Sequence, residues 1–169
     1  MKKLLLLPFM LLSLVLPAAC GESGDDPAPS GGHPGQPETP GGNESGDPGE
    51  TSLKIGITVG SRTITATMED NAAGRDFLSR LPLEVTLNDY NNTTEKIFYP
   101  DPALTTEGVT RGCTPTPGDI TIYAPWGNVA IFCKNWSYSN DLIKIGRIDG
   151  DGIEVLNVGG DIRVKFERE

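Results

Sequence analysis

Residues 118–136 read GDITIYAPWGNVAIFCKNW, two apolar runs separated by Ala-Pro-Trp-Gly. Each run alternates large apolar residues with other types, and both contain the β-branched and aromatic residues that strands favour. Ile120 and Ile122 fall on the same face of the first run, because successive strand residues point to opposite sides. The stretch therefore predicts two antiparallel strands joined by a tight turn that carries Trp126.

The same two-residue period runs through the rest of the chain from Leu53 onward. Eight segments of strand length carry it, at residues 53–59, 62–68, 83–88, 95–100, 119–124, 128–134, 143–148 and 161–167. Eight short strands are enough to close a small barrel, which leaves no sheet edge unpaired. The sequence therefore predicts a mainly β fold over residues 53–169: a closed eight-stranded β-barrel with one or two short helices.

One helix interrupts the predicted strands at residues 71–81, where apolar residues recur every four positions. Asp70 or Asn71 can cap its beginning, since short polar side chains accept hydrogen bonds from the first free N–H groups. Pro82 marks its end. Residues 152–157 predict a second helix of a single turn.

The beginning of the chain has the composition of a secretory signal peptide, predicted over residues 1–19. Two lysines precede a long apolar run, which ends in small residues and Cys20. Ala18, Ala19 and Cys20 resemble the last three positions of the bacterial lipobox, although Pro17 stands where that pattern favours Leu. We therefore expect acylation of Cys20 and attachment to a lipid bilayer, with soluble secretion as the alternative.

Residues 20–52 consist mostly of Gly, Pro, Ser and acidic residues, without an aromatic residue, Lys or Arg. Such a segment buries too little apolar surface to offset the entropy cost of ordering it. We expect a disordered tether between the membrane and residues 53–169. The acids close behind Cys20 resemble surface-export signals of some Gram-negative lipoproteins, so the expected location is the cell envelope, at the outer membrane, on its periplasmic face or at the cell surface.

The tether also holds much of the chain's negative charge. It has seven acids and no Lys or Arg, which leaves sixteen acids and twelve basic residues in 53–169, a net charge of −4. No basic stripe is present, which argues against nucleic acid as a partner. The expected partner, besides the bilayer, is a protein, peptide or small ligand that the sequence does not identify.

Three blocks, in this order along the chain, closely resemble the bacterial cyclophilin-like domains of secreted and membrane-anchored proteins. They are EDNAAGRDFLSRLPLEVTLND at 69–89, GDITIYAPWGNVAIF at 118–132 and SYSNDLIKIGRID at 137–149. The resemblance covers essentially 53–169. It implies a cyclophilin-type eight-stranded barrel, here in a lipoprotein-anchored member of the family.

Catalysis is less clearly implied. Prolyl isomerases that resemble this fold present an arginine beside a Phe-x-x-Gln segment, with a tryptophan and a histidine across a groove. The barrel domain lacks that segment, and the only histidine, His33, lies in the tether. We expect a binding or structural domain without catalytic residues and without a cofactor; a divergent peptidyl-prolyl isomerase that assists extracytoplasmic folding is the alternative.

Other chemistries receive little support from the sequence. A domain without histidine lacks the base of the common nucleophilic pairs and an imidazole ligand for zinc. Asp149 begins DGDG, which is similar to the opening of a calcium loop, but Ile153 stands at the next ligand position. We interpret DGDG as a turn and expect no metal. A small-molecule enzyme on this barrel would need an acidic or arginine-lined pocket.

Two residue sets remain as candidate features. Cys113 and Cys133 form an even pair in an exported domain, so they either form a disulfide or remain two independent thiols. Trp126 either folds over the barrel end as a lid, the favoured interpretation, or lines a groove with other aromatic residues. The aromatic candidates for this lid or groove are Tyr99, Trp126, Trp136 and Tyr138, with Phe98 beside them.

Overall fold

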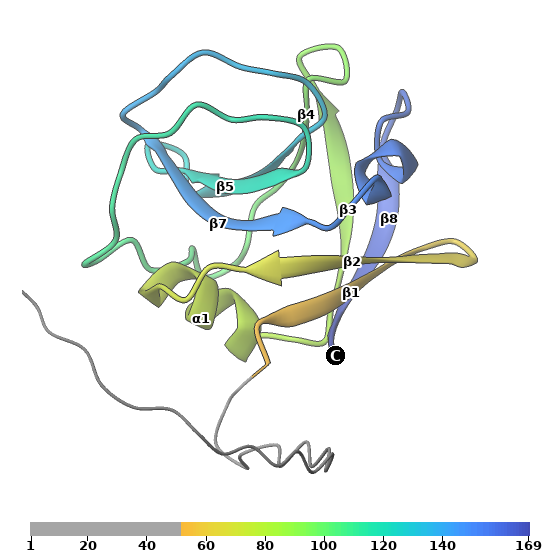
Figure 1. Ribbon diagram of the computed structural model, residues 1–169, viewed down its shortest axis with the longest axis horizontal. Helices are drawn as coiled ribbons and strands as arrows, with labels where there is room; N and C mark the ends of the chain where they lie inside the picture. Colours follow the sequence, from red (N-terminus) through yellow and green to blue (C-terminus); the bar gives the residue numbers. More distant parts are fainter. Residues whose placement is uncertain (1–51) are drawn as a thin grey trace, which may run out of the picture. The chain divides into compact units, whose positions relative to one another are not determined.

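The computed structural model describes residues 52–169. The predicted signal peptide, Cys20 and nearly all of the tether lie outside the described residues. Eight strands form a closed barrel (Figure 1), in which each strand is antiparallel to both neighbours in the order β1-β2-β7-β5-β6-β4-β3-β8. The predicted mainly β, closed eight-stranded barrel is therefore confirmed.

Each predicted strand segment overlaps one observed strand, with differences of one or two residues at several ends. The strands are β1 (Lys54–Val59), β2 (Arg62–Met68), β3 (Leu83–Tyr90), β4 (Glu95–Phe98), β5 (Asp119–Tyr123), β6 (Asn128–Phe132), β7 (Leu142–Ile148) and β8 (Ile162–Arg168). The predicted strand at 95–100 ends early, at Phe98, because Pro100 has no N–H to donate to a neighbouring strand. The pattern of apolar residues thus locates the strands, and local chemistry sets their ends.

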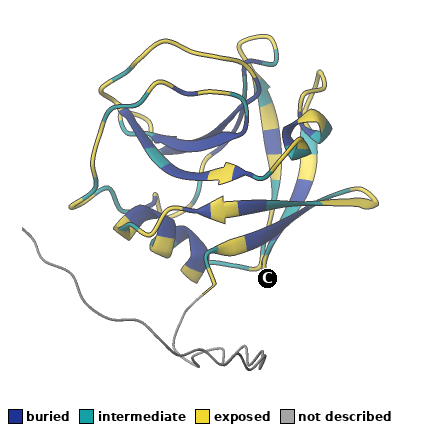
Figure 2. Cartoon of the chain, viewed as in Figure 1, coloured by how far each residue is buried: buried dark blue, intermediate teal, exposed yellow. Residues whose placement is uncertain are grey.

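The buried apolar side chains of the barrel form one core cluster. Figure 2 colours each residue by its burial and shows buried residues along the strands and α1. Ile55 and Ile57 of β1 and Val164 and Phe166 of β8 are each at most 1% exposed. Between these residues lie Gly56, which has no side chain, and Lys165, whose side chain lies on the opposite face of the strand. The alternation read from the sequence therefore decides which side chains fill the barrel.

Helix α1 (Ala72–Ser79) packs against β2 and β7. Of the two predicted capping residues, Asn71 caps the helix, since its side-chain oxygen accepts from the N–H of Gly74 at 2.8 Å. Phe77 inserts into the core, where its ring lies edge-on against Phe166 with 5.4 Å between ring centroids. No helix among the described residues has the length and apolar character needed to cross a membrane.

The segment after β7 forms a turn and then a single-turn 3-10 helix, η1 (Gly152–Val155), as predicted. The carboxylate of Asp149 accepts hydrogen bonds from the Thr65 and Thr67 hydroxyl groups at 3.0 and 2.9 Å. These bonds attach the DGDG turn to β2. Ile153 of η1 is buried in the barrel core.

Candidate ligand-binding pocket

A second apolar cluster lies on the outer face of the barrel wall. Ile120, Ile122 and Ile131 point into the core, so their neighbours along the strands point outward. The outward residues Ile97, Ala130, Phe132 and Leu142 pack together as a cluster separate from the core. The wall formed by β4, β5 and β6 and the beginning of β7 is therefore apolar on both faces.

A cavity of about 250 Å³ opens over this outer cluster. We call it the outer-face pocket. Its lining residues are Tyr90, Glu95, Ile97, Tyr123, Trp126, Asn128, Phe132, Trp136, Ser139 and Leu142. Apolar side chains form a large part of the lining, aromatic rings surround them, and Glu95 is the one lining residue of the Asp, Glu, Lys, Arg and His types.

Strand register explains why these residues meet. Glu95 lies opposite Tyr90 on β3 and opposite Phe132 on β6, so the three side chains share the outer face. Tyr123 and Asn128 form the last pair of the β5–β6 hairpin, directly before and after its turn. Residues from four segments of the chain are thus brought to one side of the wall.

Trp126 lies in that hairpin turn and extends over the outer face. The turn closes when Gly127, at φ 68°, donates its N–H to the Tyr123 carbonyl at 2.9 Å. The Trp126 ring packs edge-on against Tyr123 and Tyr90, with centroid separations of 5.3 and 6.0 Å. These two tyrosines hold the Trp126 ring in position over the pocket.

The exposure of Trp126 corrects the favoured prediction of a lid. Trp126 is 53% exposed and is not part of the barrel core. It therefore does not close the end of the barrel. The physical reason is that the tyrosine rings that attract it lie on the outside of the wall, so the turn extends over the outer face.

The four predicted aromatic candidates do not form one group. Trp136 lines the outer-face pocket together with Trp126 and is 43% exposed. Tyr99 lines a different pocket, which Arg80 and the following loop residues Pro100 and Pro102 also line. Tyr138 is exposed and directs its hydroxyl toward the Asn140 side chain, 3.0 Å away. The structure thus brings together two of the four.

Asn128 and Glu95 are lining residues that the sequence did not single out. Asn128 is 2% exposed, and its side-chain oxygen Oδ1 is buried with no hydrogen-bond partner among residues 52–169. Burial raises the pKa of the Glu95 carboxyl. Their one signal in the sequence is position: each begins a predicted strand directly after a turn, where a polar residue attracts no notice.

The two cysteines of the domain are both free, and they lie on different clusters. Cys133 is buried in the barrel core, and Cys113 packs against the outer cluster. Burial raises the pKa of Cys133 to about 11 and also raises the pKa of Cys113. A raised thiol pKa opposes formation of the reactive thiolate, so neither residue has the character of a nucleophile.

A polar group around the buried Lys96 contrasts with the pocket. We call Lys96, Asp89, Asp161 and the backbone of Val158 and Gly160 the Lys96 cluster. The Lys96 Nζ donates to the Val158 and Gly160 carbonyls at 2.6 and 2.7 Å and lies 3.5 Å from Asp89 Oδ1. Lys96 is fully buried, yet each of its three N–H groups has an acceptor nearby.

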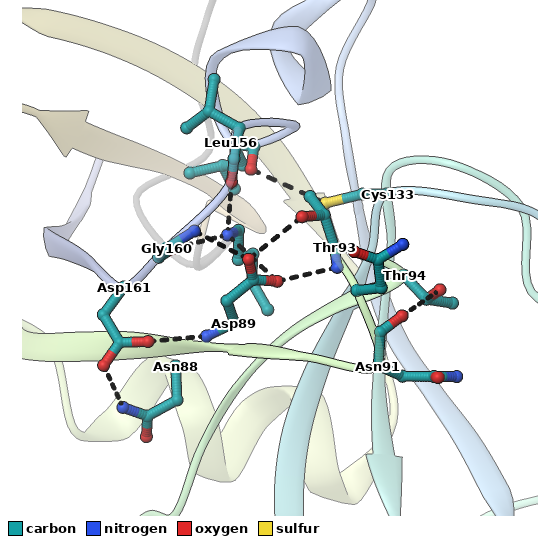
Figure 3. Close-up of polar contacts among 12 residues, drawn as sticks. Asn88, Asp89, Asn91, Thr93, Thr94, Cys133, Leu156, Gly160 and Asp161 are labelled. Atoms are coloured by element: carbon teal, nitrogen blue, oxygen red, sulfur yellow. Dashed lines mark hydrogen bonds and ion pairs between the residues drawn. The ribbon is translucent and has the colours of Figure 1, made fainter.

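The carboxylates of this cluster are equally well paired (Figure 3). Asp89 accepts from the Gly160 N–H at 2.7 Å and from the Thr93 hydroxyl at 3.0 Å. The Gly160 bond in particular holds the pKa of Asp89 below its ordinary value. Asp161 accepts from the Asp89 N–H at 2.9 Å and from Asn88 at 3.0 Å. The Lys96 cluster therefore joins β3 and β4 to the segment before β8.

Comparison with known proteins identifies the family. Residues 57–167 match the model of the cyclophilin-like family, and the chain therefore belongs to that family. The solution structure of a hypothetical protein from Archaeoglobus fulgidus is similar, with a TM-score of 0.52 and 19% sequence identity over 72% of this chain and 99% of that one. That similarity shows the fold alone. None of the curated proteins matches the chain significantly.

Proposed function

We propose that this chain is a membrane-anchored binding protein whose cyclophilin-like domain takes up its ligand in the outer-face pocket. The observation that carries the proposal is at Asn128, a lining residue of the pocket whose buried side-chain oxygen Oδ1 has no hydrogen-bond partner among residues 52–169. An unpaired buried acceptor costs about 1–3 kcal/mol. A ligand that donates a hydrogen bond to Asn128 therefore recovers free energy that the fold leaves unused.

The aromatic residues support the same proposal. Tyr90, Trp126 and Trp136 are all exposed, although large aromatic side chains gain stability from burial. They gather around one recess instead of being scattered over the surface. Exposed apolar groups collected in this way are typical of binding sites.

The anchoring part of the proposal rests on the sequence. Acylation of Cys20 attaches the chain to a lipid bilayer, and residues 20–52 serve as the spacer that their composition predicts. The domain then works outside the cytoplasm, in the cell envelope, at the outer membrane. Its ligand is a small molecule, or a side chain of a peptide or protein, that reaches this compartment.

Substitution of the predicted acceptor cysteine tests the anchor. Cys20→Ala should remain unprocessed by lipoprotein signal peptidase and unlabelled by a fatty-acid probe in cells, because the thiol accepts the lipid. Cys113→Ala is the matched control and should be processed and labelled like the wild type. Acyl labelling of the Cys20→Ala protein would refute the anchor.

Binding without catalysis is favoured over prolyl isomerisation by the composition of the pocket. Its lining contains no arginine and no histidine, so no cationic side chain is available there to polarise a prolyl peptide bond. A standard isomerisation assay with proline-containing peptides should show no acceleration by the purified protein. Acceleration that is lost on mutation of the pocket would establish the alternative, a divergent prolyl isomerase.

Intrinsic fluorescence provides a direct binding assay. The sequence contains two tryptophans, Trp126 and Trp136, and both line the pocket. A ligand that enters should change the emission of the purified full chain in a saturable way. Small aromatic amines, alcohols and acids and short peptides are titrated in turn, with Asn128→Leu as the pocket variant and Tyr138→Phe as the control. If none of the amines, alcohols, acids and peptides gives a saturable response, the proposed binding function is overturned.

A further inference from the structure

The partly buried acidic side chains of the domain differ in one respect that bears on the ligand. Six Asp or Glu residues among residues 52–169 are not exposed, and five of them form an ion pair. These five acids pair as follows: Asp76 with Arg80, Asp89 with Lys96, Asp119 with both Lys144 and Arg147, Asp149 with Lys54, and Glu167 with Lys165. The sixth acid is Glu95, for which no ion pair is found within the described residues.

The pKa values follow this difference. Burial acts to raise the pKa of Asp119, but hydrogen bonds from Thr116, Lys144 and Arg147 outweigh it and leave the pKa lowered. At Glu95 burial acts alone and raises the pKa. The fold therefore neutralises its other partly buried carboxylates and leaves the one in the pocket without a counter-charge. A cationic ligand would supply it.

The remaining lining residues suit a cation as well. Trp126, Trp136, Tyr90 and Tyr123 place four electron-rich rings around the same recess as the carboxylate. Such rings attract an ammonium group most strongly when it is partly shielded from water. The edge-on packing of Trp126 between two tyrosines fixes this ring before a ligand arrives. Little conformational freedom is then lost when the ligand binds.

Asn128 restricts the kind of cation. Its unpaired Oδ1 is an acceptor, so the matching ligand group must carry an N–H. A quaternary ammonium ion has no such hydrogen and leaves Oδ1 unpaired. The apolar lining side chains Ile97, Phe132 and Leu142 in turn favour a hydrocarbon body over a second polar group.

We propose that the outer-face pocket binds a protonated amine that retains at least one N–H and is attached to a compact apolar body. Glu95 balances its charge, Asn128 accepts an N–H, and the aromatic rings surround the ammonium group. The cavity of about 250 Å³ lies below the usual range for drug-sized ligands, ~300–1,000 Å³, which fits a small amine or a single lysine side chain. This inference rests on the proposed binding function and specifies its ligand class.

Matched probes test the charge and the N–H separately. Benzylamine, benzyl alcohol, benzoate and benzyltrimethylammonium share one apolar body and differ in the polar group. Each is titrated into the purified full chain at neutral pH, with tryptophan emission and calorimetry as readouts. Benzylamine should bind at least about tenfold more tightly than each of the other three, since a hydrogen bond to a charged group is worth more than the ~1.4 kcal/mol that corresponds to tenfold.

Variants assign the effect to residues. Glu95→Gln and Asn128→Leu should each weaken benzylamine binding by about tenfold or more. Glu107→Gln removes the same charge from an exposed residue outside the lining and should bind benzylamine like the wild type. The circular dichroism spectrum and unfolding midpoint of each variant establish that it is folded. Unchanged affinity in a folded Glu95→Gln variant would overturn the inference.

A further probe distinguishes the two sources of an amine. Nα-acetyl-lysine methylamide presents the side chain of a peptide lysine, whereas benzylamine represents a free small amine. Saturable binding of either supports the inference, and the tighter of the two indicates the natural source. Binding of benzyl alcohol or benzoate in preference to both amines would refute the amine but leave the binding function in place. If the protein responds to none of these probes and to none of the ligands titrated for the proposed function, both the amine inference and the binding function are refuted.

Discussion

Glu95 and Lys96 are consecutive residues of β4, and they illustrate two different uses of a charged side chain in the same wall. Lys96 points into the barrel, is fully buried and has three acceptors nearby. Glu95 points to the outer face, is partly buried and has no cation among the described residues. The fold provides acceptors for all N–H groups of Lys96 but provides no ion-pair partner for Glu95 among the described residues. Pairing, more than burial, separates a structural polar group from one available to a ligand.

The largest effect is expected at Lys96. Lys96→Met keeps most of the side-chain volume but leaves the Val158 and Gly160 carbonyls without this donor and Asp89 without its counter-charge. Removal of one partner from a buried charged network typically costs about 3 kcal/mol or more. The free energy of unfolding, measured with a denaturant, should fall by that amount.

Lys134→Met is the control for this substitution. Lys134 is exposed and donates to the Asn92 carbonyl at 2.7 Å, so its loss should cost no more than about 0.5 kcal/mol. Equal effects of the two substitutions would show that the Lys96 cluster does not support the fold. Lys96 would then not be a structural residue, and the contrast between the inner and outer faces of β4 would not hold.

The barrel itself was predictable because its information is local. Strand positions follow from alternation, and both the Asn71 cap and the end of α1 before Pro82 follow from single residues. Lys96 was not predictable as a buried residue, since lysine is rarely buried without partners. Those partners, the carbonyls of Val158 and Gly160, come from a segment about sixty residues later in the chain.

The pocket was predictable only in part, for a related reason. Trp126 and Trp136 could be suspected from their residue type, although the favoured position of Trp126 was wrong. Tyr90, Glu95 and Asn128 look ordinary in the sequence, and only the register of β3, β4, β5 and β6 brings them to one face. Tyr99 and Tyr138 looked equally suitable in the sequence, but neither of them lines the outer-face pocket.

A smaller effect is expected at Trp126. Truncation of a fully buried tryptophan costs about 3–5 kcal/mol, whereas Trp126 is 53% exposed and mainly contacts two tyrosine rings. Trp126→Ala should therefore lower the free energy of unfolding by about 1 kcal/mol. It should also reduce the fluorescence response to benzylamine, which Trp136 still reports, and weaken the calorimetric affinity.

Trp136→Ala should behave in the same way, while Tyr138→Phe should change neither property. If Trp126→Ala lowers the free energy of unfolding by about 3 kcal/mol or more, Trp126 supports the fold, as a lid would. The contrast between a paired interior and an incomplete pocket would then no longer hold at Trp126.

The smallest effect, and the one of opposite sign, is expected at Glu95. A carboxyl whose pKa is raised by folding binds its proton more tightly in the folded state than in the unfolded one. Its contribution to stability is therefore present at low pH and is lost as pH rises through the folded pKa. At neutral pH the unliganded domain carries this penalty, and Glu95→Gln removes it. The free energy of unfolding should rise by a few tenths to about 1 kcal/mol, less solvent screening.

The same substitution should weaken amine binding, so Glu95→Gln is expected to gain stability and lose affinity together. The gain should shrink as pH falls toward the Glu95 pKa, because the wild-type carboxyl is then also neutral. Amine affinity of the wild type should decline over that pH range as well, because a neutral carboxyl no longer balances the charge of the amine. If Glu95→Gln is less stable than the wild type at neutral pH, Glu95 already has a stabilising partner in the fold. The contrast between a paired Lys96 and an unpaired Glu95 would then give no reason to expect a cationic ligand.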